Sequence, residues 1–460
     1  MVDLDRVADR KLASHLAEGG RLRALVLELW QRTRMDWGFV TDRLAVTFRK
    51  EKWIGAHERR FVSETLYGLV RNVRRIDLAI ARGTERARDH KPGSPRDVER
   101  LIVSLLLDGL LDRERVKRAL PALDIDAALN VDDEIAAERD VGKRIALAAS
   151  LPDWLAARLV ADWGADAEAL AHALNQRAPM TVRANLLLGD RAQLATALAS
   201  EGLETTPGRW SATALVVESR TNLFATAAFK AGALEAQDEG SQLLAELAVP
   251  ATDKPLDHTA PPFGARGHAS LVVDYCAGAG GKTLAIAAAL GNRGRIIATD
   301  VDDSKLEELR RRARRAKVSN AQAMTIDDRR LDAFVGKADV VLIDAPCSGL
   351  GALRRNPEAR WRLREEELAG FAKRQREIVA AAKGLCAPGG RIVYATCSLL
   401  SIENQAVVDA VTANGELVAV PLRDVVGADR AAALGDGESL VVTPHRHGTD
   451  GFFAKVLRKA

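Results

Sequence analysis

Two cysteines stand where strand-like runs of the chain end. ADVVLIDAPC ends in Asp344 and Cys347, and RIVYATC, fifty residues later, ends in Cys397. A free cysteine is commonly a small buried hydrophobe, and its reactivity depends on a neighbouring charge or partner. Two thiols at the carboxyl ends of parallel strands would instead meet at the edge where such sheets bind ligands. The pair therefore indicates thiol chemistry at one site.

A glycine-rich turn in DYCAGAGGKT (274–283) leads into a helix-like run, an arrangement that brings backbone N–H groups against a ligand. A P-loop would need glycine where the chain has Cys276, and a dinucleotide fingerprint would need glycine where it has Thr283. Asp300 ends the next strand-like run, where a carboxylate can accept hydrogen bonds from the ribose hydroxyls of an adenosine cofactor. We expect S-adenosylmethionine rather than NAD.

The elements that must position these residues alternate between strands and helices. Apolar strand candidates separated by helical stretches predict an α/β fold with a parallel, doubly wound sheet. The candidates are SLVVDYC (270–276), RIIATDV (295–301), a less well defined AQAMTIDD (321–328), ADVVLIDAPC (338–347) and RIVYATC (391–397).

The texture of the sequence changes along the chain. Residues 1–140 have apolar residues at three- and four-residue steps and predict an all-helical domain. Residues 150–245 mix short strands with helices and predict a small α+β module. Residues 246–270 are rich in Pro, Gly and His and predict a flexible surface insertion. Residues 271–460 then form the α/β domain.

Charge and composition narrow the function. The net charge is only +4, but arginines cluster at 310–317 and around Trp361, which favours a phosphate-rich partner such as RNA. The four cysteines form no C-x-x-C pair, so we expect no disulfide framework and no metal site. No window has the roughly 18 uninterrupted apolar residues of a membrane span, and the first residues lack the apolar core of a signal peptide. We expect a cytoplasmic monomer with no membrane partner.

At this point the sequence resembles the RNA cytosine-C5 methyltransferases of the RsmB/NSUN (Sun) type over about 150–460. The motifs that carry the resemblance are DYCAGAGGKT (274–283), DAPCSG (344–349), RRNP (354–357), ATCS with IEN (395–404), PMTVRAN (179–185), QDEGSQLLAEL (237–247) and DGFFAKV (450–456). Residues 1–140 resemble, more weakly, the NusB-like domain of the RsmB branch through ERRFVSETLYGLVR (58–71). That branch methylates small-subunit ribosomal RNA.

The resemblance implies a Rossmann-like methyltransferase domain and roles for its reactive residues. Cys397 would be the nucleophile that adds to C6 of cytosine, and Cys347 would assist the later removal of the C5 proton. A free thiol titrates at about 8.5, so it needs local help to ionise near neutral pH. Asp344 would contact the base at N3, where a carboxyl group can stabilise displaced charge, and Lys282 would support it.

The resemblance also implies a cofactor site. It assigns Cys276, Ala277, Gly278, Ala279, Gly280, Gly281 and Lys282 to the methionine portion of S-adenosylmethionine, Asp300 to the ribose and Asp344 to the same site. The acidic residue near the adenine is Asp327 or Asp328, and we choose Asp327 because Arg329 completes a D-x-R. Arg183 would lie on an RNA-facing strand. The family usually has proline where this chain has Ala279, but every glycine of the turn is kept.

Two other functions stay open. The same chemistry could act on tRNA, because the motifs report the reaction rather than the RNA; the helical N-terminal region argues for ribosomal RNA. A non-catalytic RNA-binding assembly factor would have no need of both Cys347 and Cys397, so their retention argues for an enzyme.

Overall fold

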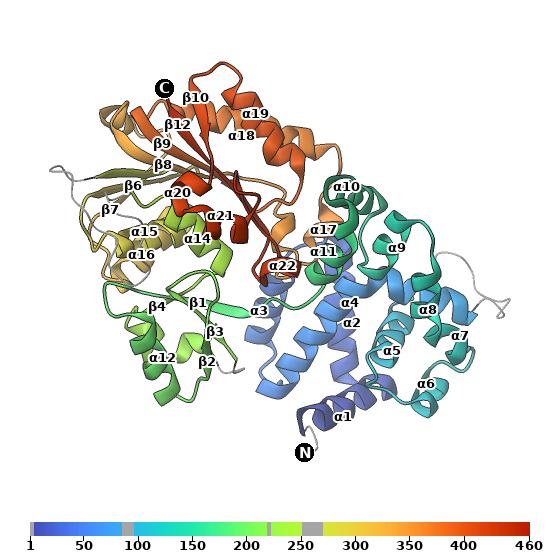
Figure 1. The fold of residues 1–460 in the computed structure, drawn as a ribbon. Helices are drawn as coiled ribbons and strands as arrows, with labels where there is room; N and C mark the ends of the chain where they lie inside the picture. Colours follow the sequence, from blue (N-terminus) through green and yellow to red (C-terminus); the bar gives the residue numbers. More distant parts are fainter. Residues whose placement is uncertain (1–3, 85–95, 219–221, 251–269) are drawn as a thin grey trace. The chain divides into compact units, whose positions relative to one another are not determined.

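The computed structural model describes residues 4–84, 96–218, 222–250 and 270–460 (Figure 1). The chain divides into two compact units, Met1–Gln176 with Leu353–Glu365, and Arg177–Ala352 with Glu366–Ala460. Most of the expected insertion at 246–270, namely 251–269, lies outside the described residues, while Glu246 and Leu247 close a helix.

The first unit is all-helical, as its apolar periodicity predicts. The longest helix, α4 (Ala56–Thr84), buries a stripe of residues at three- and four-residue steps, which is what packs a helix onto a shared core. The other helices are α1 (Leu4–Glu18), α2 (Arg21–Asp36), α3 (Val40–Lys50), α5 (Asp97–Leu107), α6 (Arg113–Ala119), α7 (Ile125–Leu129), α8 (Val131–Ala137), α9 (Val141–Ala148), α10 (Asp153–Trp163), α11 (Ala167–Leu174) and α17 (Ala359–Arg362). The unit therefore continues past the expected boundary at 140 and takes in α10 and α11.

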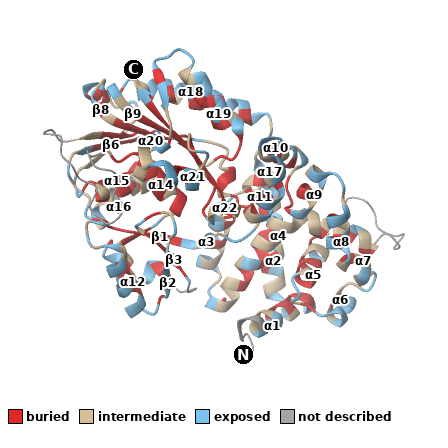
Figure 2. Ribbon diagram, viewed as in Figure 1, coloured by how far each residue is buried: buried red, intermediate tan, exposed pale blue. Residues whose placement is uncertain are grey.

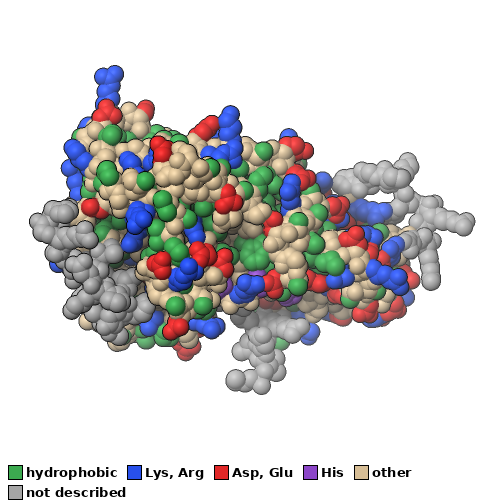
Figure 3. Space-filling model, turned by 45° about the horizontal axis from the view of Figure 1, so that its top comes forward, with side chains coloured by type: hydrophobic (Ala, Val, Ile, Leu, Met, Phe, Trp, Pro, Cys, Tyr) green, Lys and Arg blue, Asp and Glu red, His purple; other side chains and the backbone are tan. Residues whose placement is uncertain are grey.

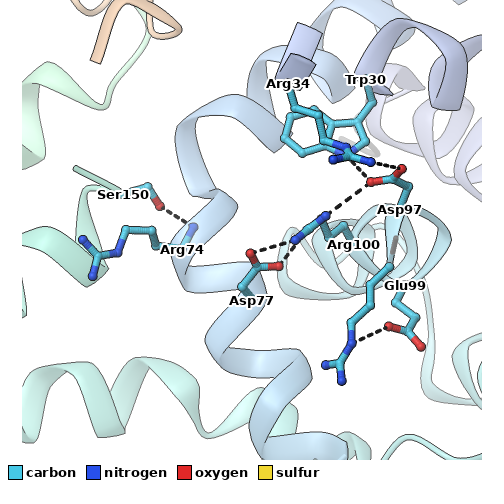
Figure 4. A network of polar contacts seen from close by, with 9 residues as sticks. Trp30, Arg34, Arg74, Asp77, Asp97, Glu99, Arg100 and Ser150 are labelled. Carbon is cyan, nitrogen blue, oxygen red and sulfur yellow. Dashed lines mark hydrogen bonds and ion pairs between the residues drawn. The ribbon is translucent and has the colours of Figure 1, made fainter. Parts of the chain in front are cut away.

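A buried carboxylate ties the helices of the first unit together (Figure 4). Asp97, at the start of α5, accepts hydrogen bonds from the indole of Trp30 at 3.0 Å and from Arg34 at 3.0 Å. Arg100 bridges Asp97 to Asp77 of α4. Burial opposes the charge, but the bonds to Arg34 and its neighbours hold the pKa of Asp97 below its usual value. The carboxylate is thus a fixed junction between α2, α4 and α5.

The segment Leu353–Glu365 belongs to this helical unit although it lies between the two cysteine motifs in the sequence. Trp361 stacks on Trp37 with ring centroids 5.4 Å apart, and Arg360 is fully buried. The Arg360 guanidinium donates to the Ala149 carbonyl at 2.5 Å and to Asn175 at 2.9 Å. Arg354 and Arg360 of this arginine run are therefore part of the helical core, whereas Arg362 and Arg364 are exposed.

The second unit contains a small antiparallel sheet and a large sheet. The small sheet has the order β2-β3-β1-β4, with β1 (Met180–Ala184), β2 (Thr205–Pro207), β3 (Ala214–Val217) and β4 (Leu234–Ala236). The helices that accompany it are α12 (Arg191–Ser200), α13 (Ala227–Lys230) and α14 (Glu239–Leu247). This is the expected α+β module, and it shares one compact unit with the large sheet.

The large sheet has the order β10-β12-β9-β8-β5-β6-β7, with β11 paired to β12. Its strands are β5 (Leu271–Asp274), β6 (Arg295–Asp300), β7 (Ala321–Thr325), β8 (Ala338–Asp344), β9 (Cys386–Thr396), β10 (Leu417–Val420), β11 (Leu440–Val442) and β12 (Phe452–Lys459). The five predicted strands, β5 to β9, are parallel to one another, as expected. An antiparallel extension, in which β12 pairs with β9 and β10, adds to that prediction.

Helices cover both faces of the large sheet, so neighbouring residues of a strand enter different cores. Val272 and Ile296 pack against α14 and α15, whereas Val273 and Ile297 pack with residues of α18 and α19. Figure 2 shows these central strands buried along their length. The helices of this layer are α15 (Gly281–Ala289), α16 (Asp303–Arg315), α18 (Glu367–Lys383), α19 (Gln405–Thr412), α20 (Arg423–Val426), α21 (Ala428–Leu434) and α22 (Pro444–His447). The result is a Rossmann-like, doubly wound arrangement.

The arginine run at 310–317 does not form the free basic patch that its sequence suggests. Arg312 and Arg315 pair with the buried Glu235 of β4, and Arg310 and Arg311 pair with carboxylates of their own helix, α16. On the face shown in Figure 3, Lys and Arg side chains are interspersed with Asp and Glu side chains. Within the described ranges, no helix is long and apolar enough to cross a lipid bilayer.

Candidate active site

The ends of β8 and β9 bring the two cysteine loops together. The strands are parallel neighbours with Asp344 opposite Ala395, so Cys347 and Cys397 leave the sheet side by side. Their sulfur atoms are 3.2 Å apart, within hydrogen-bonding distance, and either thiol could be the donor. Both residues are half-buried. The site therefore holds two thiols in direct contact, which no single cysteine motif could show.

The two thiols are not equivalent. The hydrogen bond shared with Cys397, together with burial, raises the pKa of Cys347 well above its usual value. Cys347 is thus favoured as the protonated partner that donates to Cys397.

A lysine–aspartate pair lies next to the thiols. The Lys282 ammonium group is 2.5 Å from a carboxylate oxygen of Asp344, the last residue of β8. Burial opposes its charge, but Asp344 outweighs this and raises the pKa of Lys282. Electrostatic interaction with Cys397 also contributes to the raised pKa of Lys282, so the ammonium group lies close to that thiol. The pair places one positive and one negative group beside the thiols.

The glycine-rich turn is held rigidly between β5 and α15. Gly280 has φ +85°, and a Cβ there would lie 2.5 Å from Leu309 of α16, so only glycine fits. The backbone N–H of Gly278 donates to Asp300 at 2.9 Å. The carbonyl of Ala279 accepts from Arg312 at 2.8 Å. That bond anchors the turn at the position where the family usually has proline.

A cavity of about 350 Å³ opens beside this turn. It is lined by the turn itself (Cys276, Ala277, Gly278, Ala279, Gly281 and Lys282), by Asp274, Asp344 and Arg312, and by Ala236, Gln237, Asp238 and Ser241 of the α+β module. One Asp274 oxygen accepts from Thr283 at 2.6 Å, while the other is buried and has no hydrogen-bond partner within the described structure. Burial raises the pKa of Asp274 to about 6. The unpartnered oxygen is a ready acceptor for a cationic ligand group.

Comparison with known proteins identifies the family. The family model described as "16S rRNA methyltransferase RsmB/F" matches residues 266–458. A second family model, for the ferredoxin-like domain of RsmF/B-type proteins, matches residues 151–223. The ribosomal RNA small subunit methyltransferase B of Xylella fastidiosa is 35% identical over 318 residues, covering 68% of this chain and 69% of that protein. The chain belongs to the RsmB/F family.

Further relatives of this RsmB/F chain agree with that assignment. The ribosomal RNA small subunit methyltransferase B of Vibrio cholerae is 31% identical, covering 67% of this chain and 65% of the relative. A methyltransferase relative from Mycobacterium tuberculosis is 41% identical over 228 residues, but the match spans only 45% of its length and 48% of this chain. The crystal structure of PH0851 superposes with a TM-score of 0.70 at 25% identity, covering 94% of this chain and 97% of PH0851. NSun6 from Pyrococcus horikoshii, with a TM-score of 0.52 at 20% identity over 65% of this chain and 96% of its own, shares the fold.

The acidic residues expected at the ribose and adenine of the RsmB/F site lie beyond the cavity lining. Asp300 ends β6, and its two oxygens accept backbone N–H groups of Gly278 and Asp302 at 2.9 Å each. Asp328 caps the following short helix and forms an ion pair with Arg330, which lowers its pKa to about 2. Asp327 is exposed and makes no such bond in the described structure.

Arg183 does not fit the expected RNA-facing position in this RsmB/F chain. Its side chain is buried, and its guanidinium donates to Gln237 at 2.7 Å beside the cavity. Burial lowers the pKa of Arg183 to about 10, while the charge of Glu235 opposes that effect. The buried side chain therefore supports Gln237, which lines the cavity.

Three polar residues that line the RsmB/F cavity were not assigned to it from the sequence. Asp274 opens the motif DYCAGAGGKT, but its position alone did not show that one of its oxygens is buried without a partner. Gln237 and Asp238 begin the family motif QDEGSQLLAEL, which pointed to them, although nothing in the sequence linked the α+β module to the cofactor turn.

Proposed function

We propose that this protein methylates C5 of cytosine in RNA, with S-adenosylmethionine as the methyl donor and small-subunit ribosomal RNA as the substrate. The observation that carries the proposal is the contact between Cys347 and Cys397 at strand ends adjoining the cavity. Cytosine C5 is a poor nucleophile, so the reaction needs one thiol to activate the ring and a second group to help release the product.

The cavity residues fit S-adenosylmethionine. The positive charge of its amino group matches the unpartnered Asp274 oxygen, and the glycine turn exposes backbone N–H groups at the start of α15. In our proposal Asp300 holds the ribose and Asp327 lies near the adenine. The bound donor supplies an electrophilic methyl group.

The residues of this chain would act in two stages. First, the Cys397 thiolate forms a bond to C6, and the electron pair of the C5–C6 double bond moves so that C5 becomes the nucleophile. Asp344 would contact N3, where charge accumulates, with Lys282 holding the carboxylate in place. C5 would then form a bond to the methyl carbon while the bond from that carbon to the donor's sulfur breaks, which leaves S-adenosylhomocysteine.

In the second stage the C5 proton leaves, the C5–C6 double bond re-forms, and the bond between C6 and the Cys397 sulfur breaks. Cys347 would assist this step. Its raised pKa arises first from the bond to Cys397, and that acceptor is lost once the Cys397 sulfur is bonded to C6. The Cys347 thiol then gives up its own proton to solvent more readily, and the resulting thiolate can accept the C5 proton at the stage that needs a base.

Substitution of each thiol tests the proposal. Cys397→Ala should abolish both methylation and the covalent protein–RNA complex, whereas Cys347→Ala should accumulate that complex, visible on a denaturing gel. Cys386→Ala, at the buried start of β9, is the matched control and should retain turnover. Methylation by Cys397→Ala would overturn the assigned roles.

The identity of the RNA substrate and the hypothesis that the protein is an enzyme need separate tests. The ribosomal RNA named for the relatives in V. cholerae and X. fastidiosa supports ribosomal over transfer RNA. Bisulfite sequencing of RNA from a strain lacking this protein should show one lost 5-methylcytosine in small-subunit RNA; a loss in tRNA would select the alternative. S-adenosylhomocysteine should raise the melting temperature, since a ligand of the native state stabilises it. No shift at saturating ligand would favour a non-catalytic assembly factor.

A further inference from the structure

A buried carboxylate lies beneath both cysteine loops. Glu403 ends the short helix Ser401–Glu403, in the motif IEN, and its side chain is fully buried. A carboxylate without water persists only where hydrogen bonds replace its hydration, because burying an unpaired charge costs several kcal/mol. The groups that supply those bonds show what Glu403 holds.

The donors to Glu403 come from the residues that follow the two thiols. One oxygen accepts the backbone N–H of Ser348 at 2.9 Å and the Gln375 side chain at 3.1 Å. The other accepts the hydroxyl groups of Ser348 and Ser398 at 2.5 Å each. Ser348 is bonded to Cys347, and Ser398 is bonded to Cys397. The Glu403 side chain is therefore hydrogen-bonded to both cysteine loops, at the residue that follows each cysteine.

Neighbouring bonds fix the same assembly. The Tyr394 hydroxyl donates to the Glu403 carbonyl at 2.5 Å, and Asn404 donates to the Ser398 carbonyl at 3.0 Å. The Gly351 N–H donates to the Cys397 carbonyl at 2.8 Å, which joins the two loops directly. With these bonds in place, neither loop can shift without breaking a contact to the other.

We propose that Glu403 is a positioning residue that sets the contact between Cys347 and Cys397. After the bond to Cys397 and burial, the charge of Glu403 also contributes to the raised pKa of Cys347. The structural part stands on the contacts above, and the catalytic consequence rests on the proposed function. The charged and titratable groups facing the thiols are Glu403, Tyr394 and Lys282. Glu403 acts on Cys347 and Lys282 acts on Cys397, so the two thiols experience opposite charges.

The test of the charge uses Glu403→Gln in the full chain, without RNA. Alkylation of each cysteine by iodoacetamide is followed by mass spectrometry across pH, because only the thiolate reacts. Removal of a nearby negative charge should lower the midpoint for Cys347 by about one pH unit, which is about tenfold faster alkylation below the midpoint. An unchanged midpoint in a variant that melts as a folded protein would overturn the role of the charge.

The test of the clamp uses Ser348→Ala with Ser398→Ala, which removes two hydroxyl donors and keeps the charge. With the thiol contact loosened, kcat for RNA methylation should fall about tenfold or more with KM unchanged. The Cys347 midpoint should fall as well, because the bond to Cys397 that raises its pKa is weakened. Wild-type kcat would overturn the clamp, and this variant decides the question if Glu403→Gln does not fold.

A matched control separates both effects from the general cost of losing a buried carboxylate. Glu239 is also buried and accepts backbone N–H groups of Trp210 and Ser211, but it has no bond to either cysteine loop. Glu239→Gln should leave the Cys347 midpoint unchanged; an equal shift would overturn the proposal. If the wild-type protein did not methylate RNA, the proposed function would fail, but the alkylation experiment would still decide whether Glu403 controls Cys347.

Discussion

Replacement of Glu235 by alanine tests how the α+β module is joined to the glycine-rich turn. The Glu235 side chain is only 3% exposed and pairs with Arg312 at 3.0 Å and with Arg315. The negative charge of the same carboxylate favours the charged form of the buried Arg183. Glu235→Ala would therefore leave three arginines without the one carboxylate that lies between them.

The expected cost follows from the burial of the pair. Breaking a buried ion pair by removing one partner costs about 3–5 kcal/mol. The Arg312 and Arg315 side chains are 18% and 23% exposed, so water reaches them in part and the lower end, about 3 kcal/mol, applies. For a domain of this size that corresponds to a fall in melting temperature of about 6–12 °C.

Thermal unfolding with and without S-adenosylhomocysteine measures both the stability and the coupling. Arg312 also donates to the Ala279 carbonyl, so its release should weaken ligand binding and reduce the ligand-induced shift. The control is Glu308→Ala on the same helix, whose partner Arg311 is 66% exposed; an exposed pair is worth at most about 1 kcal/mol. Equal melting temperatures for the two variants would refute the reasoning.

Three further outcomes are expected. In the proposed cofactor site the ligand's amino group pairs with ionised Asp274, whose pKa burial raises to about 6. Calorimetric affinity for S-adenosylhomocysteine should therefore rise about fivefold from pH 5 to 6 and about tenfold from pH 5 to 7, where it levels off. Asp274→Asn should remove this rise, and an unchanged slope would contradict the role. Gly280→Ala forces a Cβ onto Leu309 and should cost about 2–4 kcal/mol in chemical denaturation, whereas Gly370→Ala, with open space around it, should not destabilise. Trp361→Ala should destabilise the helical unit by about 2–4 kcal/mol in a urea titration, and wild-type stability would show that the Trp37 stack is dispensable.

The parallel core and the thiol pair were predictable because their signals are local. Buried parallel strands appear as continuous apolar runs, and each run here ends at its chemical residue, as Asp344 ends β8. The juxtaposition of Cys347 and Cys397 then followed from the geometry of parallel sheets.

The misplaced residues depend on partners that are distant in the sequence. The run at 310–317 indicated RNA because it contains no acidic residue of its own. Its partners are Glu307 and Glu308, which precede it on α16, and Glu235 on the distant strand β4. Arg183 was expected on an RNA-facing strand because of the family resemblance of PMTVRAN (179–185), and its bond to Gln237 depends on how β1 packs. The number of charged residues in a segment does not show which of them form ion pairs within the folded protein.

The passage of residues Leu353–Glu365 through the helical unit has a consequence for synthesis on the ribosome. A domain at the N-terminus ordinarily folds as soon as it emerges, while the rest of the chain is still being made. Here Arg360 and Trp361 complete a core whose other residues emerge by Gln176. At about 5–20 residues per second, the nascent helices wait on the order of ten seconds or more for the missing piece. Cys347 precedes this segment in the sequence. The ribosome therefore makes Cys347 before the helical core can be completed, and Cys397 only afterwards.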